Sequence, residues 1–235
     1  MKNTQQAEFG GETARHAVVV SAGVAEGHNP KRAAIVRAAT ELFLDAGYAA
    51  TSMDAIAARA EVSKRTVYSR FDSKESLFAA VMNDLCERLV GPCPLGDDWH
   101  GPPEEVMPQI GHWVMALSTA PEAIAVYRVV VGEAVRTPGL GRIFMDNGPG
   151  LLVTKLTAYI EAERRSGRLD VGDVRLAAAQ FMELVNGPLT LPLLLNQRPL
   201  PSRETRRRVV DGAVTVFLDA YRPDGRHARF GPRRR

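Results

Sequence analysis

The amino-acid sequence predicts an all-α protein in which a small N-terminal helical bundle precedes a larger helical domain. Apolar residues recur at helical spacing along most of the 235 residues, whereas period-2 alternation and hairpin turns between β-branched stretches are missing. Prolines and glycines then divide the helical pattern into segments, because neither residue is favoured inside a helix. We therefore expect a succession of helices joined by short loops.

Composition and charge exclude several classes of protein. Hydrophobic residues make up 45% of the chain and charged residues 24%, which are ordinary values for a globular protein. No uninterrupted apolar run is long enough for a transmembrane helix, and the N-terminus lacks the apolar segment of a secretory signal. Two cysteines cannot form a disulfide framework. The sequence therefore predicts a cytoplasmic protein without a membrane partner.

The net charge of +3 arises at the C-terminal end, where residues 222–235 hold six arginines and one aspartate. Residues 223–235 are predicted to be a basic disordered tail, either simply solvated or in accessory contact with phosphates. Residues 1–28 lack a helical period and are predicted to be a disordered leader. The high isoelectric point is therefore weak evidence that the folded part binds nucleic acid.

The first helix is expected to begin at Asn29-Pro30, since asparagine is a good N-cap and proline suits the first helical position. Gly47 is expected to end it. Its apolar stripe has the spacing i, i+3, i+4, i+7, i+8 and consists of Ile35, Ala38, Ala39, Leu42 and Phe43.

Further helices are predicted from the same periodicity. Two short segments at 53–60 and 64–71 are followed by a long helix that ends before Gly91. A kink or break is expected at Pro188 and Pro192, because each removes a backbone donor. The remaining helices are expected near 103–119, 121–136, 149–166, 173–197 and 202–222, with a short turn of helix at 140–145.

The segments 53–60 and 64–71 have the dimensions of a helix-turn-helix, in which the second helix enters the major groove of DNA. Val67 and Phe71 are four residues apart and are expected to point inward. The outer face then carries donors, hydroxyls and an aromatic ring, which suit phosphates and base edges. These residues are Lys64, Arg65, Thr66, Tyr68 and Ser69.

Residues 35–82 resemble the TetR family of transcriptional regulators, in the stretch IVRAATELFLDAGYAATSMDAIAARAEVSKRTVYSRFDSKESLFAAVM. The family commonly has glycine in the turn where this chain has Glu61. The resemblance implies a DNA-binding domain at 29–73 and a helical ligand-binding and dimerisation domain at 74–222. It also implies contacts with double-stranded operator DNA from Thr51, Ser52, Lys64, Arg65, Thr66, Tyr68 and Lys74.

The C-terminal part has a second resemblance, in the stretch RVVVGEAVRTPGLGRIF at residues 128–144, to repressors of the AefR type that regulate efflux. Regulators of this kind bind a small-molecule effector. Large apolar residues on the middle helices are candidates for its pocket, although plain core packing is the more frequent explanation for any one of them. The candidates are Trp113, Met115, Tyr127, Phe144, Phe181 and Met182.

The helices around 176–195 and 209–221 are more apolar than one buried face requires. We interpret the surplus as a homodimer interface, with a four-helix bundle formed by two subunits; the alternative is a core helix buried on all sides.

Motifs of enzymes, cofactor sites and metal sites are missing from the sequence. The sequence thus predicts a non-enzymatic repressor, without a cofactor or metal, that an apolar ligand releases from a palindromic operator. Activation instead of repression stays open, as does a helical small-molecule sensor that does not bind DNA.

Overall fold

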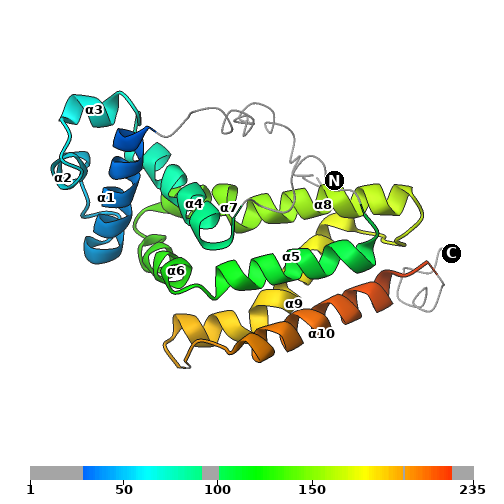
Figure 1. Cartoon of the computed structure of the whole chain (residues 1–235). Coiled ribbons are helices and arrows are strands. Elements are labelled where there is room, and N and C mark those ends of the chain that lie inside the picture. The colour runs from blue at the N-terminus through cyan, green and yellow to red at the C-terminus, as the bar shows by residue number, and fades with distance from the viewer. Residues whose placement is uncertain (1–28, 92–100, 198, 224–235) are drawn as a thin grey trace, which may run out of the picture.

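The computed structural model describes residues 29–91, 101–197 and 199–223, and these form ten helices and no strand (Figure 1). The all-α prediction is confirmed. The leader, the tail beyond Pro223, Trp99 and Cys93 lie outside the described residues. The helices are α1 (Pro30–Ala46), α2 (Met53–Arg59), α3 (Lys64–Tyr68), α4 (Lys74–Val90), α5 (Pro103–Ser118), α6 (Pro121–Glu133), α7 (Pro138–Asn147), α8 (Pro149–Arg165), α9 (Val174–Leu194) and α10 (Arg203–Tyr221).

The ends of α1 are those that the sequence predicts. The side-chain oxygen of Asn29 accepts hydrogen bonds from the backbone N–H groups of Lys31 and Arg32, at 3.2 and 3.4 Å. Gly47 follows the last turn with φ +85°, a backbone conformation in which a Cβ would be strained. Local capping chemistry therefore sets both ends of this helix.

Two of the later helices differ from the expectation. The short turn of helix expected at 140–145 is part of α7, which has ten residues. Helix α9 runs through Pro188 and Pro192 as one helix, so the alternative of a break is wrong, and a kink stays a prediction. Its residues on both sides of the prolines are buried, Val185 before them and Leu193 after them, so packing outweighs the lost backbone donors.

Glu61 lies in the turn between α2 and α3 with φ +54°, where glycine would be unstrained. The backbone N–H of Glu61 bonds to the carbonyl of Ala58 at 3.2 Å, and that of Val62 to the carbonyl of Ala57 at 3.0 Å. This pair of bonds is the Schellman motif, whose left-handed position usually holds glycine. The turn thus keeps its geometry at a backbone cost of about 1 kcal/mol.

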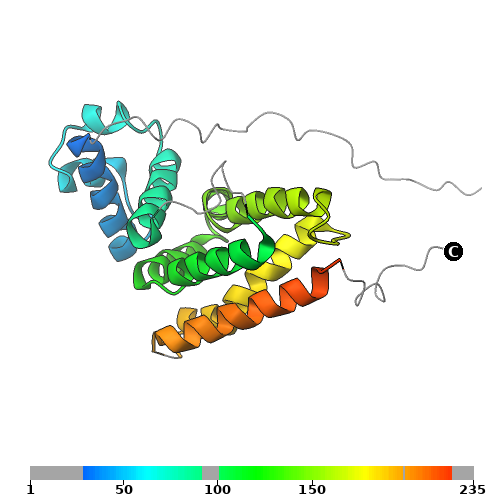
Figure 2. The same cartoon turned by 45° about the vertical axis from the view of Figure 1, so that its right-hand side comes forward.

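The apolar residues form two cores rather than one, and the helices α5, α8, α9 and α10 of one core lie together, away from α1 to α3 (Figure 2). One core joins α5, α8, α9 and α10. The other joins α1 to α4 with α6 and α7, through residues such as Val130 and Phe144. The apolar packing of the helix-turn-helix therefore continues into helices that follow residue 74, and the boundary between 29–73 and 74–222 stays a prediction.

Within the described residues, no single helix is long and apolar enough to cross a membrane. Helices α5 and α6 reach that length and composition only as a pair, and a bend of 69° separates them.

Candidate DNA interface and effector cavity

Helix α3 has one face inside the protein and one outside it. It ends at Tyr68 rather than at the predicted residue 71, and the Ser63 hydroxyl caps its start by accepting from the Thr66 N–H at 3.1 Å. Val67 is fully buried and Phe71 is 5% exposed, as their four-residue spacing predicts. These two side chains fix the rotation of α3 about its axis, so the opposite face lies in solvent.

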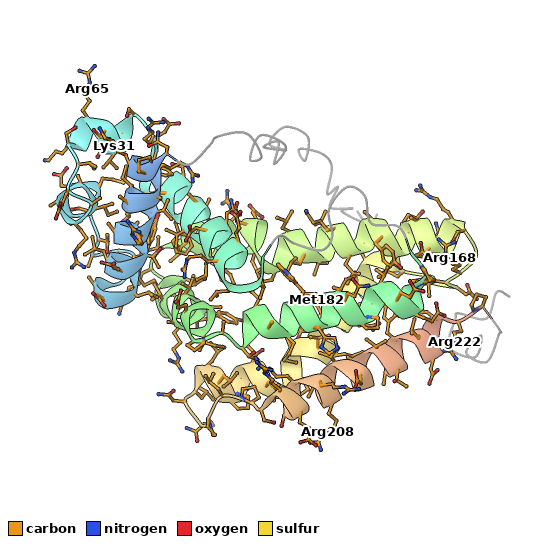
Figure 3. The ribbon with its side chains drawn as sticks, viewed as in Figure 1. Lys31, Arg65, Arg168, Met182, Arg208 and Arg222 are labelled. Carbon is orange, nitrogen blue, oxygen red and sulfur yellow. The ribbon has the colours of Figure 1, made fainter. Side chains whose placement is uncertain are left out.

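The outer face of α3 carries the side chains predicted to meet DNA. Arg65 points away from the rest of the protein at the end formed by α1 to α3 (Figure 3). Tyr68 is 52% exposed, although it is a large aromatic residue. Lys64 forms an ion pair with Asp54 of α2, and the Thr66 hydroxyl lies 2.8 Å from that of Ser63. The structure therefore brings these residues together on one exposed surface.

Ser52, also a predicted contact, is exposed at the start of α2. Its hydroxyl accepts a hydrogen bond from the Ala55 N–H at 3.1 Å and so caps the helix.

Thr51 and Lys74 do not lie as predicted. Thr51 is 3% exposed, and its hydroxyl donates to the carbonyls of Gly47 and Leu42 at 2.7 and 3.1 Å. The Lys74 ammonium donates to the carbonyls of Tyr48, Thr51 and Ala49, at 2.7, 2.9 and 3.4 Å. Both side chains bind the loop 47–51 instead of a phosphate, because their hydrogen-bond donors are already occupied by nearby backbone carbonyls.

The same loop surrounds a buried phenol. Tyr48 is 2% exposed, and its ring lies 4.4 Å from the Lys74 nitrogen. Burial, with the charge of the Glu75 carboxylate, raises the pKa of this phenol, so it stays neutral at physiological pH. The loop before α2 is therefore held by charge, hydrogen bonds and aromatic packing together.

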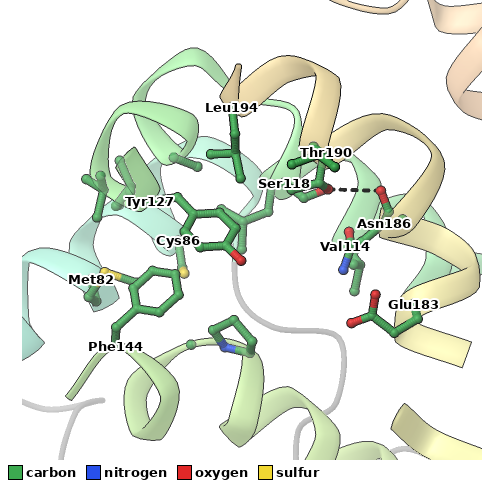
Figure 4. A pocket seen from close by; sticks show the side chains of 18 residues that line it. Met82, Cys86, Val114, Ser118, Tyr127, Phe144, Glu183, Asn186, Thr190 and Leu194 are labelled. Atoms are coloured by element: carbon green, nitrogen blue, oxygen red, sulfur yellow. Dashed lines mark hydrogen bonds between the residues drawn. The ribbon is translucent and has the colours of Figure 1, made fainter. Parts of the chain in front are cut away.

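A cavity of about 420 Å³ lies among α4, α5, α6, α9 and the start of α8 (Figure 4). Its wall is mainly apolar, with residues such as Met82 and Leu85 from α4 and Val126 from α6. The rings of Tyr127 and Phe144 stack at one side, with centroids 5.3 Å apart. Its size and lining are typical of a small-molecule site.

Three polar residues of the cavity wall come from α9, and Ser118 of α5 and Tyr127 of α6 add hydroxyl groups. Glu183, Asn186 and Thr190 all line it, and the Thr190 hydroxyl donates to the Asn186 carbonyl at 2.9 Å. Among the described residues no group hydrogen-bonds the buried side-chain oxygen of Asn186. An unsatisfied buried amide is costly, and a polar ligand could relieve that cost.

Two of the six predicted pocket residues, Tyr127 and Phe144, line this cavity. Trp113 lines a neighbouring cavity of about 220 Å³. Met115, Phe181 and Met182 line neither cavity; they lie in the core of α5, α8, α9 and α10. Both sets of residues are apolar and helical, so only the way the helices pack separates a cavity wall from a core.

No pattern in the sequence indicated the part of the cavity wall that α4 contributes. Met82, Leu85 and Cys86 line the cavity, but their spacing on α4 equals that of an ordinary core face.

Among the described residues no three His, Cys, Asp or Glu side chains are grouped as a metal site would require.

Comparisons with known proteins bear on both ends of the chain. Residues 35–81 match the family model of bacterial regulatory proteins of the tetR family. Residues 105–223, half of the chain, match that of the AefR-like transcriptional repressor C-terminal domain. This protein belongs to the TetR family. As a TetR-family protein it is a DNA-binding transcriptional regulator, and that family is one of regulators rather than enzymes.

Solved TetR-family structures resemble this TetR-family protein over most of its length. The flavonoid-responsive regulator FrrA is 33% identical, with a TM-score of 0.67 over 84% of this chain and 100% of that one. A TetR-family regulator of Pseudomonas syringae pv. tomato is 34% identical, with a TM-score of 0.61 over 83% and 98%. The transcriptional activator FasR of Mycolicibacterium smegmatis is 45% identical over 60 residues, which are 26% of this chain and 27% of FasR.

Replacing Lys74 with methionine should lower the free energy of unfolding by about 1.5–3 kcal/mol, because the ammonium bonds to three backbone carbonyls. Urea denaturation measures this change. Lys31→Met is the control, since Lys31 is exposed, and should change stability by less than about 0.5 kcal/mol. A Lys74→Met protein of unchanged stability that binds DNA more weakly would make Lys74 a phosphate contact after all.

Proposed function

We propose that this regulator is a cytoplasmic repressor that binds a palindromic operator as a homodimer and releases it when a small apolar molecule enters the 420 Å³ cavity. The position of the cavity carries the proposal. Its wall includes α4, and α4 begins directly after the predicted DNA-binding domain, residues 29–73, which we call the DNA-binding unit. The Ser73 hydroxyl caps the start of α4. A ligand between α4, α5, α6 and α9 can therefore favour one position of the helix-turn-helix over another.

The operator contacts follow from exposure and chemistry. Arg65 points away from the protein and can form two hydrogen bonds with a guanine edge in the major groove. Lys64, Thr66 and Ser52 offer donors to the phosphates on either side, and Tyr68 offers a ring and a hydroxyl to the backbone or to a thymine methyl. Thr51 and Lys74 are not part of this set, because they hold the loop 47–51.

The homodimer is supported by apolar side chains that a monomer leaves in water. Leucines on or beside α9 and a valine on α10 are between 37% and 61% exposed, although neighbouring residues of both helices are buried. They are Leu176, Leu184, Leu191, Leu195 and Val216. A second subunit that packs its own α9 and α10 here would cover them, and would also supply the second recognition helix that a palindrome requires.

The effector is proposed to be an aromatic molecule with hydroxyl groups. The apolar wall and the stacked rings of Tyr127 and Phe144 suit an aromatic body, and the polar groups on α9 suit hydroxyls. FrrA, a relative of similar length, is named as flavonoid-responsive. A flavonoid is therefore the first probe to use.

The sign of regulation rests on the C-terminal match, which covers residues 105–223 and is to a repressor domain, whereas FasR, named as an activator, matches over only 60 residues. A reporter gene placed under control of the operator distinguishes repression from activation.

Replacing Arg65 with alanine should weaken binding to the operator by about 1–3 kcal/mol and reduce the preference for guanine at one position. Lys64→Ala should instead weaken binding to all sequences. It should also reduce the slope of log K against log salt concentration by about one. Fluorescence anisotropy on a site selected from random DNA measures both. Arg208→Ala is the control, since Arg208 points away from the protein on α10, far from Arg65 (Figure 3). If both variants bind the operator with unchanged affinity, the proposal that α3 contacts DNA is wrong.

Leu184→Glu should convert the dimer to a monomer at micromolar concentration, because the dimer would bury a charge without a partner, at a cost of several kcal/mol. Sedimentation velocity measures the change. Leu194, though as apolar as Leu184, is unsuitable because it lines the cavity. Val135→Glu, at a residue that is 91% exposed and lies outside α9 and α10, should leave the dimer intact. A wild-type protein that is already monomeric would contradict the homodimer.

The flavonoid naringenin should quench tryptophan fluorescence saturably in a Trp99→Phe background, since Trp113 lines the adjoining cavity. It should also weaken operator binding, and operator DNA should weaken naringenin binding by the same factor. The variant Ala123→Phe, which fills part of the cavity, should abolish the quenching. If a panel of apolar and aromatic compounds shows no saturable binding, the effector proposal fails.

A further inference from the structure

Two charged side chains from different helices hold the same loop of the DNA-binding unit. The loop 47–51 joins α1 to α2. A side-chain oxygen of Glu133, the last residue of α6, accepts a hydrogen bond from the Ala49 N–H at 2.7 Å. Lys74, the first residue of α4, donates to the carbonyl of the same Ala49 and to those of Tyr48 and Thr51. Helix α6 thus binds the N–H of Ala49, and helix α4 binds its carbonyl.

Both helices also form the wall of the cavity. Helix α4 contributes Met82, Leu85 and Cys86, and α6 contributes Ala123, Val126 and Tyr127. Val126 lies seven residues before Glu133, which on a helix is about 10 Å along the axis. A molecule in the cavity therefore contacts α6 two turns from the residue that holds the loop.

The contact between Glu133 and the loop leaves little space. A methyl group on Gly47 would overlap the Glu133 carboxylate, and Gly47 has φ +85°, which itself disfavours any larger residue. The carboxylate therefore lies directly against the loop backbone. A small displacement of the end of α6 either breaks the bond to Ala49 or moves the loop.

The other part of α6 is fixed to α9. The Arg128 guanidinium donates to the carbonyls of Leu193 and Leu194 at 2.7 and 3.0 Å, and to the Asn196 side chain at 3.0 Å. Leu194 lines the cavity as well. Helix α6 is thus attached to the cavity region at Arg128 and to the DNA-binding unit at Glu133.

We propose that Glu133 is a positioning residue that couples occupancy of the cavity to DNA binding, through its hydrogen bond to the Ala49 N–H. An occupant that displaces α6 breaks this bond, frees the loop 47–51 on its α6 side, and changes the position of α2 and α3. The inference rests on the proposed effector cavity and adds a route through α6 that the sequence did not indicate. The backbone bonds of Lys74 remain on the α4 side of the loop.

A double-mutant cycle tests this coupling without an identified effector, because Ala123→Phe places a ring in the cavity. Operator affinity is measured for wild type, Ala123→Phe, Glu133→Ala and the double variant. We expect Ala123→Phe to weaken operator binding about tenfold in the wild-type background and less than twofold in the Glu133→Ala background. Glu133→Gln should keep most of the tenfold effect, because its amide oxygen can still accept from Ala49.

Glu122→Ala is the matched control. Glu122 is a carboxylate on the same helix, but it pairs with Arg88 at the far end of α4, at 2.8 Å. This variant should retain the full effect of Ala123→Phe.

A tenfold effect of Ala123→Phe that persists in the Glu133→Ala background overturns the role of Glu133 but leaves the effector cavity standing. No effect of Ala123→Phe in the wild-type background overturns the proposed effector control, and this inference with it. If Glu133→Ala abolishes operator binding, hydrogen exchange of the Ala49 amide decides instead. Ala123→Phe should accelerate that exchange about tenfold, and unchanged protection overturns the proposal.

Discussion

The aromatic cluster of Phe43, Tyr48 and Phe78 is the contact on which the rest of the structure depends. The ring centroids lie between 5.2 and 5.6 Å apart, and the three residues come from α1, from the loop after it and from α4. Each ring is at most 2% exposed. Because this cluster fixes α1 against α4, it also fixes the helix-turn-helix against a helix that lines the 420 Å³ cavity.

The cavity lies where the two apolar cores meet. Met82, Val126 and Phe144 in its wall belong to the core that includes the DNA-binding unit, whereas Val114 belongs to the core of α5, α8, α9 and α10. The cavity of about 420 Å³ therefore has walls from both cores. A molecule bound at this junction contacts both cores, which is why occupancy can alter their relative position.

The recognition helix could be predicted closely, and the cavity only in part. The spacing of Val67 and Phe71 indicated which face of α3 is buried, and thereby which face holds Arg65 and Tyr68. By contrast, Val114 and Met115 are adjacent apolar residues of α5 that both belong to the same core, yet only Val114 also lines the cavity. Periodicity identifies an apolar face but does not say whether that face meets another helix or an empty space.

The sequence by itself determined the all-α fold, the limits of α1 and the outward face of α3, because these follow from interactions between residues close in the chain. Only the tertiary structure decided that Lys74 bonds to loop carbonyls, that Glu133 reaches Ala49 across 84 residues, and that α9 continues through two prolines. These outcomes depend on how distant helices approach one another, and the free energy of that packing is not encoded in any local pattern.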